Sequence, residues 1–235
     1  MNRSITAVSA LAVAATATLF AGCAGDMTNR LANDRQVLRD MTIADPPIPA
    51  AVVRQSKAIL VLDTVNIAAG IGFEGGGGTL VRNLGDGRWS APLAMSVIAG
   101  SLGIQIGGEG RQVVLILNDE QVIERILSQD AYPLMGAAAV AGPNAAQANY
   151  QNLPVPSVYS YSKTGGLFVG AMVGGLGITI DEKLNNKVYG GRSPREILSG
   201  SVPTPAGGIA YAAQLDAMGR IQPTLATEIS GDAPE

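Results

Sequence analysis

Clustered glycines constrain the fold of this chain more than any other feature of its sequence. The chain has 235 residues and 30 of them are glycine, about 13% against an average near 7%. The glycines concentrate in three stretches that also carry β-branched residues, at 70–78, 100–110 and 165–177, and the first ends in four consecutive glycines. Glycine inside a strand relieves crowding at bends and bulges, so the pattern predicts a strongly curved sheet. The stretches have no fixed period, which argues against a solenoid.

The strands of this sheet are expected to be short and joined by glycine-containing turns. Their connections are too short for parallel crossovers, so we expect antiparallel pairing. Gly85-Asp86-Gly87 is a strong turn signal within this region. A further β section is expected over 158–180. The expected strands of the first region are Ile59–Val65, Thr79–Val81, Leu93–Ile98, Leu102–Ile106 and Val113–Leu117.

Helices are expected on both sides of the strand-rich regions. Asn118 is predicted to cap one of them, with Gln121 in the capping-box position. Ser193 and Glu196 form a second capping box, with Pro194 at the first helical position. Three more helices are expected over Asn29–Met41, Pro49–Leu60 and Ala206–Met218. The predicted fold class is therefore α+β, with a curved, glycine-rich antiparallel sheet, half-barrel or sandwich-like, and several flanking helices.

The first 23 residues have the pattern of a bacterial export signal. Arg3 is followed by an uncharged stretch over 5–20 and then by Ala21-Gly22-Cys23. Sixteen uncharged residues suit a signal sequence better than a permanent span, which needs about 20. Phe20 to Cys23 resembles the bacterial lipobox, although leucine is usual at the position of Phe20. The resemblance implies that Cys23 receives diacylglycerol and becomes the new N-terminus. The alternative is an ordinary signal peptide beside a chance cysteine.

The composition excludes several classes of chemistry. The chain has no histidine and one cysteine, which removes Ser-His-Asp and Cys-His catalysis, histidine-ligated metals and any intrachain disulfide. A net charge of −3 argues against a nucleic-acid partner. The string over 70–75 matches G-x-G-x-x-G but continues into glycines that cannot open a helix, so we interpret it as a curved strand or turn. Asp119 and Glu120 suit a helix N-terminus, and Asp181 and Glu182 are expected in a turn. We expect no enzyme, no cofactor and no metal.

One string is distinctive enough to indicate a family. Residues 86–92, Asp-Gly-Arg-Trp-Ser-Ala-Pro, resemble the D-G-x-W-S-x-P signature of the SYLF-domain family. The string over 103–108 resembles the family's G-x-Q-I-G-G turn. Residues 166–170, together with Asp181, Asn185 and Tyr189-Gly190, resemble the closing half of the domain. The resemblance covers roughly residues 45 to 220.

The resemblance implies a non-enzymatic, lipid-binding domain of mixed α and β structure. The family includes eukaryotic adaptors that bind phosphoinositides and, in yeast, actin, and also bacterial envelope lipoproteins. We expect the domain to bind anionic or other phospholipid head groups, without catalysis. Removing Arg3 leaves 15 basic and 19 acidic residues, which argues against strong phosphoinositide-type binding, and the actin activity is not carried over. The competing hypothesis is a structural or interaction protein of the envelope, with no lipid ligand beyond its own anchor.

Six residues are candidates for contact with lipid: Phe73, Arg88, Trp89, Arg111, Lys163 and Phe168. An amphipathic tryptophan beside a basic residue suits a membrane interface, and the two phenylalanines flank glycine clusters that could form an apolar groove. The alternatives are core packing for the three aromatic residues and a solvated turn for Lys163.

The predicted organisation has four parts. Residues 1–22 are a lipoprotein signal peptide, and 23–46 comprise the lipidated N-terminus, a spacer and the first helix. Residues 47–221 form the SYLF-like lipid-binding domain, and 222–235 a mobile tail. Ala24 after the cysteine is similar to the outer-membrane sorting pattern of Gram-negative lipoproteins. We therefore expect attachment to the outer membrane through acyl chains, palmitate among them, with the domain facing the periplasm.

Overall fold

The structure is a computed structural model, and it describes residues 26–128, 132–133, 140–141, 156–164, 167–168 and 177–220. The predicted signal peptide, Cys23 and the predicted tail over 222–235 lie outside these residues. The helices are α2 (Met27–Thr42), α3 (Ala50–Gln55), α4 (Glu120–Ser128), α6 (Glu182–Tyr189), α7 (Pro194–Leu198) and α8 (Gly208–Arg220). The strands are β1 (Ala58–Gly85), β2 (Arg88–Trp89), β3 (Leu93–Leu117), β4 (Tyr132–Pro133), β5 (Val140–Ala141), β6 (Val158–Thr164), β7 (Leu167–Phe168) and β8 (Gly177–Ile180).

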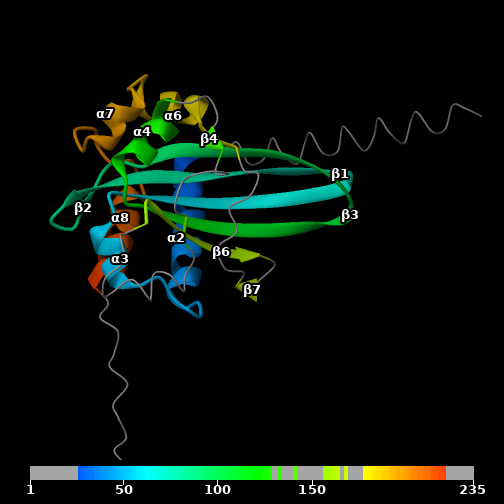
Figure 1. Cartoon of the computed structure of the whole chain (residues 1–235). Helices are drawn as coiled ribbons and strands as arrows, with labels where there is room; N and C mark the ends of the chain where they lie inside the picture. Colours follow the sequence, from blue (N-terminus) through cyan, green and yellow to red (C-terminus); the bar gives the residue numbers. More distant parts are fainter. Residues whose placement is uncertain are drawn as a thin grey trace, which may run out of the picture.

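The strands form one open, curved sheet with helices around one end of it (Figure 1). The pairing is antiparallel except between the short strands β5 and β6. β6 and β8 pair with different parts of β3. This arrangement confirms the predicted α+β class with a curved, glycine-rich sheet.

Two very long strands, β1 and β3, form the centre of the sheet. Their antiparallel register runs from Ala58 opposite Leu117 to Leu80 opposite Leu93, with one slip between Ala69 and Ile71. The prediction of five short strands separated by glycine turns is therefore wrong, although the predicted turn at Gly85-Asp86-Gly87 is confirmed. The glycines of the first two clusters lie inside the strands, because a glycine can follow a sharp bend while its backbone stays paired.

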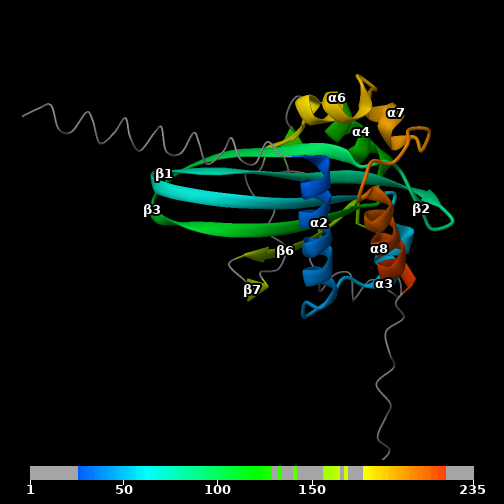
Figure 2. The same cartoon turned by 180° about the vertical axis from the view of Figure 1, so that it is seen from behind.

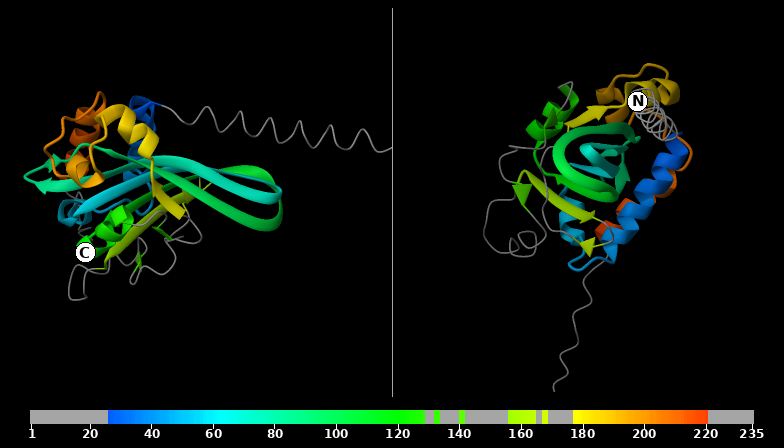
Figure 3. Two further views of the ribbon diagram at one scale, coloured as in Figure 1. Left: turned by 90° about the horizontal axis from the view of Figure 1, so that it is seen from above. Right: turned by 90° about the vertical axis from the view of Figure 1, so that its right-hand side faces the viewer.

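The β1–β3 hairpin folds back over itself, and the run of four glycines lies where the two halves of β1 meet. A Cβ added at Gly76 would lie 2.7 Å from the Thr64 Cα, and one at Gly78 would lie 2.7 Å from the Val61 carbonyl carbon. Real Cβ atoms do not approach other atoms so closely. In the right-hand view of Figure 3, the strands curl into a spiral. The glycine run thus permits a backbone-to-backbone contact that no side chain would allow.

Helix α2 crosses this folded-over hairpin and contacts both of its halves. Near its start, Arg30 Nη1 donates to the Met95 carbonyl of β3 at 2.9 Å. In its middle, Asp34 accepts a hydrogen bond from Thr79 of β1. Near its end, Asp40 forms an ion pair of 3.6 Å with Lys163 of β6. Figure 2 shows α2 and α8 on the same side of the sheet, where Arg35 and Gln214 exchange hydrogen bonds.

The hydrophobic core lies between the curved sheet and its helices. The predicted apolar face of the first helix is confirmed, since Leu31, Val37, Leu38 and Met41 are all fully buried. Successive residues of a strand point to opposite faces of the sheet. All residues from Ala58 through Leu62 are nevertheless buried, so both faces of this part of β1 are covered. The predicted helix over 49–60 accordingly ends at Gln55, since the residues after Lys57 are needed as a central strand.

Two further local predictions are wrong and two are confirmed. Asn118 does not cap α4: the Asp119 carboxylate accepts from the Gln121 backbone N–H at 2.9 Å, and Asn118 donates to the Pro156 carbonyl instead. Asp181 and Glu182 were expected in a turn at the end of a strand. They do follow β8, but the Asp181 carboxylate caps the N-terminus of α6 and Glu182 is the first residue of that helix. The Ser193–Glu196 capping box of α7 is present, and α8 lies within two residues of the predicted span.

Candidate functional site

The six candidate lipid contacts do not form one site. Arg88 and Trp89 make up β2, which lies at one end of the sheet, whereas Phe73 lies opposite Gly100 near the hairpin bend at the other end (Figure 1). Phe168 of β7 is paired with Lys163 of β6. The structure therefore separates the candidates into groups that no single small ligand could contact together.

The two basic candidates in the middle of the sheet do not combine into a basic patch. Lys163 is paired with Gln112, and Arg111 is paired with Thr164. Paired residues share a face and neighbours along a strand alternate, so Arg111 and Lys163 belong to opposite faces of the sheet. Lys163 is in addition ion-paired with Asp40 of α2. Electrostatic attraction of an anionic head group by this pair is therefore weak.

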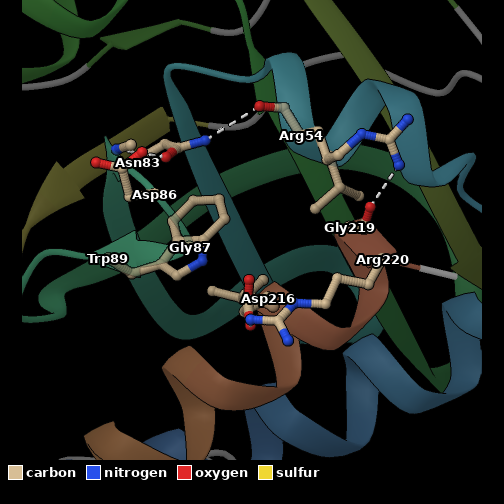
Figure 4. Close-up of a pocket in the computed structure, with 11 residues that line it drawn as sticks. Arg54, Asn83, Asp86, Gly87, Trp89, Asp216, Gly219 and Arg220 are labelled. Carbon is tan, nitrogen blue, oxygen red and sulfur yellow. Dashed lines mark hydrogen bonds and ion pairs between the residues drawn. The ribbon is translucent and has the colours of Figure 1, made fainter.

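Trp89 forms one wall of an open pocket of about 410 Å³ between α3, the β1–β2 turn and α8 (Figure 4). The tryptophan is half-buried and packs against the core, so it combines the core role with a surface that faces the pocket. The lining residues are Val53, Arg54, Asn83, Gly85, Asp86, Gly87, Trp89, Leu215, Asp216, Gly219 and Arg220.

Most charged side chains around this pocket form hydrogen bonds or ion pairs with other residues of the fold. Arg54 Nη1 donates to the Gly219 carbonyl at 2.6 Å, and Arg220 is ion-paired with Asp216. Figure 4 shows the Arg54 contact bridging α3 and the end of α8. Because two arginines and two aspartates line the pocket, its formal charges cancel, which gives no preference for an anionic or a cationic ligand.

The distinctive string over 86–92 builds the turn beside this pocket. Gly85, Asp86 and Gly87 all have positive φ angles, of 83°, 54° and 72°, which glycine and aspartate tolerate better than most residues. Ser90 Oγ accepts from the Arg82 backbone N–H at 2.9 Å and so ties β2 to β1. The residues of this string therefore form a tight hairpin turn and place a half-buried tryptophan beside it.

A buried polar centre lies under α2, and sequence reasoning did not identify it. Asp34 is fully buried; its Oδ2 accepts from Thr79 Oγ1 at 2.6 Å, and its Oδ1 has no partner among the described residues. A second hydrogen bond of 3.2 Å joins Thr79 Oγ1 to the hydroxyl of Tyr211 in α8. The only sequence signal was an aspartate on the apolar face of a predicted helix.

Burial controls the protonation of this centre. Loss of hydration raises the pKa of Asp34 well above its ordinary value, although Thr79 and the positive charge of Arg30 oppose the shift. Burial and the nearby charge of Asp40 also raise the pKa of Asp63 in β1. Both carboxyls therefore hold their protons to higher pH than an exposed carboxyl would.

No group of three or more potential metal ligands occurs within the described ranges.

The bend of the β1–β3 hairpin is built from two uncharged segments of the chain. The chain has no charged residue from 64 to 73 or from 89 to 108. These segments contain the bend, where Ile71 is paired with Leu102. The bend extends away from all the labelled helices in Figures 1 and 2. In the part of the chain that the structure describes, no helix combines the length and apolar character needed to cross a bilayer.

The fold and these surfaces define a small α+β domain with an open pocket at one end and an uncharged hairpin bend at the other. Residues 98–217, about half of the chain, match the family model described as "Ysc84: Las17-binding protein actin regulator". The chain therefore belongs to the Ysc84 family, as its resemblance to SYLF domains predicted. The family description names binding and regulation and no reaction.

Several relatives show the same likeness. The chain is 35% identical over 170 residues to Protein YSC84 of Saccharomyces cerevisiae, covering 69% of this chain and 36% of that protein. It is 34% identical over 172 residues to LAS seventeen-binding protein 3 of the same yeast, covering 69% and 37%. It is 32% identical over 166 residues to SH3 domain-containing YSC84-like protein 1 of Homo sapiens, covering 69% and 48%. The chain thus spans between about a third and a half of the length of these relatives.

Proposed function

We propose that this chain is an outer-membrane lipoprotein whose domain binds lipid through the bend of the β1–β3 hairpin, without catalysis. The observation that carries the proposal is the bend itself, which is uncharged over 64–73 and 89–108 and extends beyond the helices (Figure 1). Where apolar surface is exposed, it typically marks a site of contact with a membrane or another protein.

The backbone of the bend is suited to an apolar environment. Strands β1 and β3 remain paired on both sides of the register slip, with Ala69 opposite Ile106 and Ile71 opposite Leu102. A paired backbone has already satisfied its hydrogen bonds, so it can approach the acyl region without leaving polar groups unsatisfied. With no charge nearby in the sequence, there is also no ion to remove from water.

Hydrophobic contact explains lipid binding by this chain better than head-group electrostatics does. The structure separates the basic candidates Arg88, Arg111 and Lys163, and Lys163 is already ion-paired. The chain from residue 23 onward carries 15 basic and 19 acidic residues, so its overall charge opposes an anionic surface. Binding is therefore expected to survive high salt, which screens only the electrostatic part.

Vesicle co-sedimentation tests this proposal. The chain over 24–235, which contains every described helix and strand, is incubated with phosphatidylcholine vesicles and with phosphatidylethanolamine–phosphatidylglycerol vesicles at low and high salt. We expect binding to both compositions, nearly independent of salt. Phe73→Asp places a charge near the bend and should weaken binding by about tenfold or more, since an aspartate within a bilayer is strongly unfavourable.

Ile209→Asp is the matched control for this substitution. Ile209 is 77% exposed on α8, away from the bend, so the same apolar-to-acidic change there should leave binding unaltered. Equal binding by wild type and Phe73→Asp would contradict the role of the bend. Binding lost at high salt would instead indicate head-group electrostatics, with Arg88, Arg111 and Lys163 as the residues to test.

The anchor makes a separate prediction. Cys23→Ser should abolish metabolic labelling by palmitate and move the protein out of the outer-membrane fraction in bacteria, since two or more acyl chains give stable attachment and none remains. Position 23 is not part of any described helix or strand, and we expect the circular-dichroism spectrum of the purified protein to stay the same. Palmitate labelling that persists in the Cys23→Ser protein would show that Cys23 is not the attachment site.

A second candidate function is an envelope protein that binds another protein and has no lipid ligand beyond its anchor. The description of the family model favours it, because it names binding to a protein, Las17. Failure of the 24–235 chain to sediment with any vesicle, together with intact palmitate labelling at Cys23, would favour this candidate.

A further inference from the structure

We infer that α6 and the first turn of α2 form the face that lies against the bilayer, where exposed lysines of α6 contact anionic phospholipid head groups. This inference rests on the lipid anchor at Cys23 proposed above. It adds the orientation of the domain to that proposal, and it follows from the length of the tether, the surroundings of α2 and the local charge.

The tether between the anchor and the fold is very short. Helix α2 begins at Met27, so only residues 24–26 separate it from Cys23. Four Cα-to-Cα steps reach at most about 14 Å when fully extended. The first residue of α2 must therefore stay within that distance of a cysteine held at the surface of the membrane.

Helix α6 is the exposed element beside this end of α2. Arg30, in the first turn of α2, forms an ion pair of 3.1 Å with Asp181, and Asp181 caps the N-terminus of α6. Figures 1 and 2 show α6 near the N-terminal end of α2 in both views. α4 and α7 lie beside α6 in the same views, so a bilayer that holds Cys23 faces this group of helices rather than α3 or α8.

The charge of this face suits an anionic membrane. From α6 through α7, the exposed charged residues are the basic Lys183, Lys187, Arg192 and Arg195 and the acidic Glu182 and Glu196. Arg192 is ion-paired with Glu196, and Arg195 with Glu124 of α4. With Glu124 included, four basic and three acidic residues leave a small positive balance in a chain that is acidic as a whole. Lys183 and Lys187 lie one helical turn apart on the same side of α6, and neither has an ion-pair partner among the described residues. Both are free to contact lipid phosphates.

The orientation also keeps the hairpin bend near the membrane. Figure 1 shows the β1–β3 hairpin extending sideways from α2, so anchoring the end of α2 lays the hairpin along the bilayer. Helix α2 has 16 residues, which corresponds to about 24 Å. Ile43, which follows its last residue and is 84% exposed, is therefore held on the side away from the membrane.

Site-specific labelling tests the orientation in the full lipidated protein. Cys23 is the only cysteine and its thiol is consumed by the lipid, so an introduced cysteine is a unique site for a fluorophore. Asn186→Cys, exposed on α6, is compared with Ile43→Cys in phosphatidylethanolamine–phosphatidylglycerol vesicles that contain head-group-nitroxide lipid. We expect at least threefold stronger quenching at position 186. Equal quenching, or stronger quenching at position 43, would overturn the inference.

Charge reversal tests the head-group contact separately. The Lys183→Glu and Lys187→Glu pair should lower the quenching at position 186 by at least half, whereas the pair Arg39→Glu and Lys57→Glu, with the same change in net charge at exposed positions elsewhere, should not. Equal effects of the two pairs would overturn the head-group contact.

The failures of the two proposals are distinguishable. Mass spectrometry of the purified protein first establishes whether Cys23 carries lipid. If Cys23 carries none, the inferred orientation is overturned, whereas lipid binding by the bend is still decided by the vesicle assay. With the lipid present, a bend that does not bind lipid would leave the difference between positions 186 and 43 unchanged.

Discussion

Replacing Gly78 with valine is expected to abolish cooperative folding of this domain. A Cβ at this position would overlap the Val61 carbonyl oxygen and lie 2.9 Å from the Leu62 Cα. These are backbone atoms of the buried half of β1, which is held in register by β3, so they cannot move aside as the tip of a flexible side chain could. The expected loss is at least about 3 kcal/mol of the free energy of unfolding.

Chemical denaturation followed by circular dichroism measures this effect, and Gly110→Val is the matched control. Gly110 lies in β3, and a Cβ added there meets no atom within 4 Å. Valine at position 110 should be neutral or slightly stabilising, since it favours extended backbone more than glycine does. Similar denaturation midpoints for the Gly78 and Gly110 variants would disprove the close contact between the two halves of β1.

The second large expected effect is a fall in stability as the pH rises above about 4, which Asp34→Asn should reduce. Burial raises the pKa of Asp34 in the folded protein, whereas the unfolded chain releases this proton near pH 4. Between these two pKa values the folded state holds a proton that the unfolded state has lost, so raising the pH favours unfolding. One such proton contributes a slope of about 1.4 kcal/mol per pH unit. Asparagine resembles the protonated carboxyl and does not titrate.

Denaturation curves between pH 4 and 8 measure this slope for the wild type and three variants. The groups whose charges act on Asp34 are Arg30 of α2 and Asp63 of β1, and the hydroxyl of Tyr211 contacts it through Thr79. Asp63→Asn should remove a further part of the slope, because the pKa of Asp63 is raised in the same direction. Asp86→Asn, in an exposed turn where asparagine also tolerates a positive φ, is the control. Identical slopes for the wild type and Asp34→Asn would exclude Asp34 as the source.

Local signals in the sequence predicted α2, α7 and α8 well, whereas α3 is shorter than expected and α6 was not predicted. The apolar spacing of α2 and the Ser193–Pro194–Glu196 start of α7 depend on residues within one or two turns, and both are confirmed. The length of β1 was not predictable in this way. Gly76 and Gly78 are explained by contacts with Thr64 and Val61, which a local pattern cannot reveal, so the glycines were interpreted as turns.

The surfaces were harder to predict than the fold. Residue type alone singled out Lys163, but its ion-pair partner, Asp40, is 123 positions earlier in the chain, a separation that only the packing of α2 on β6 explains. Asp34 was missed because its burial depends on Thr79 and on Tyr211 of α8. The Trp89 string was recognised by resemblance, and the structure adds the physical reason for it, a turn with three consecutive positive φ angles.

The folded-over hairpin also determines how this domain could be shortened. The segment that matches the family model begins at residue 98, five residues inside β3. The partner of β3 at both of its ends is β1. A fragment cut at that boundary would lose β1 and α2 and would expose both the backbone of β3 and the buried face of α8. The smallest fragment expected to fold on its own therefore begins before α2, near residue 26, and continues through Arg220.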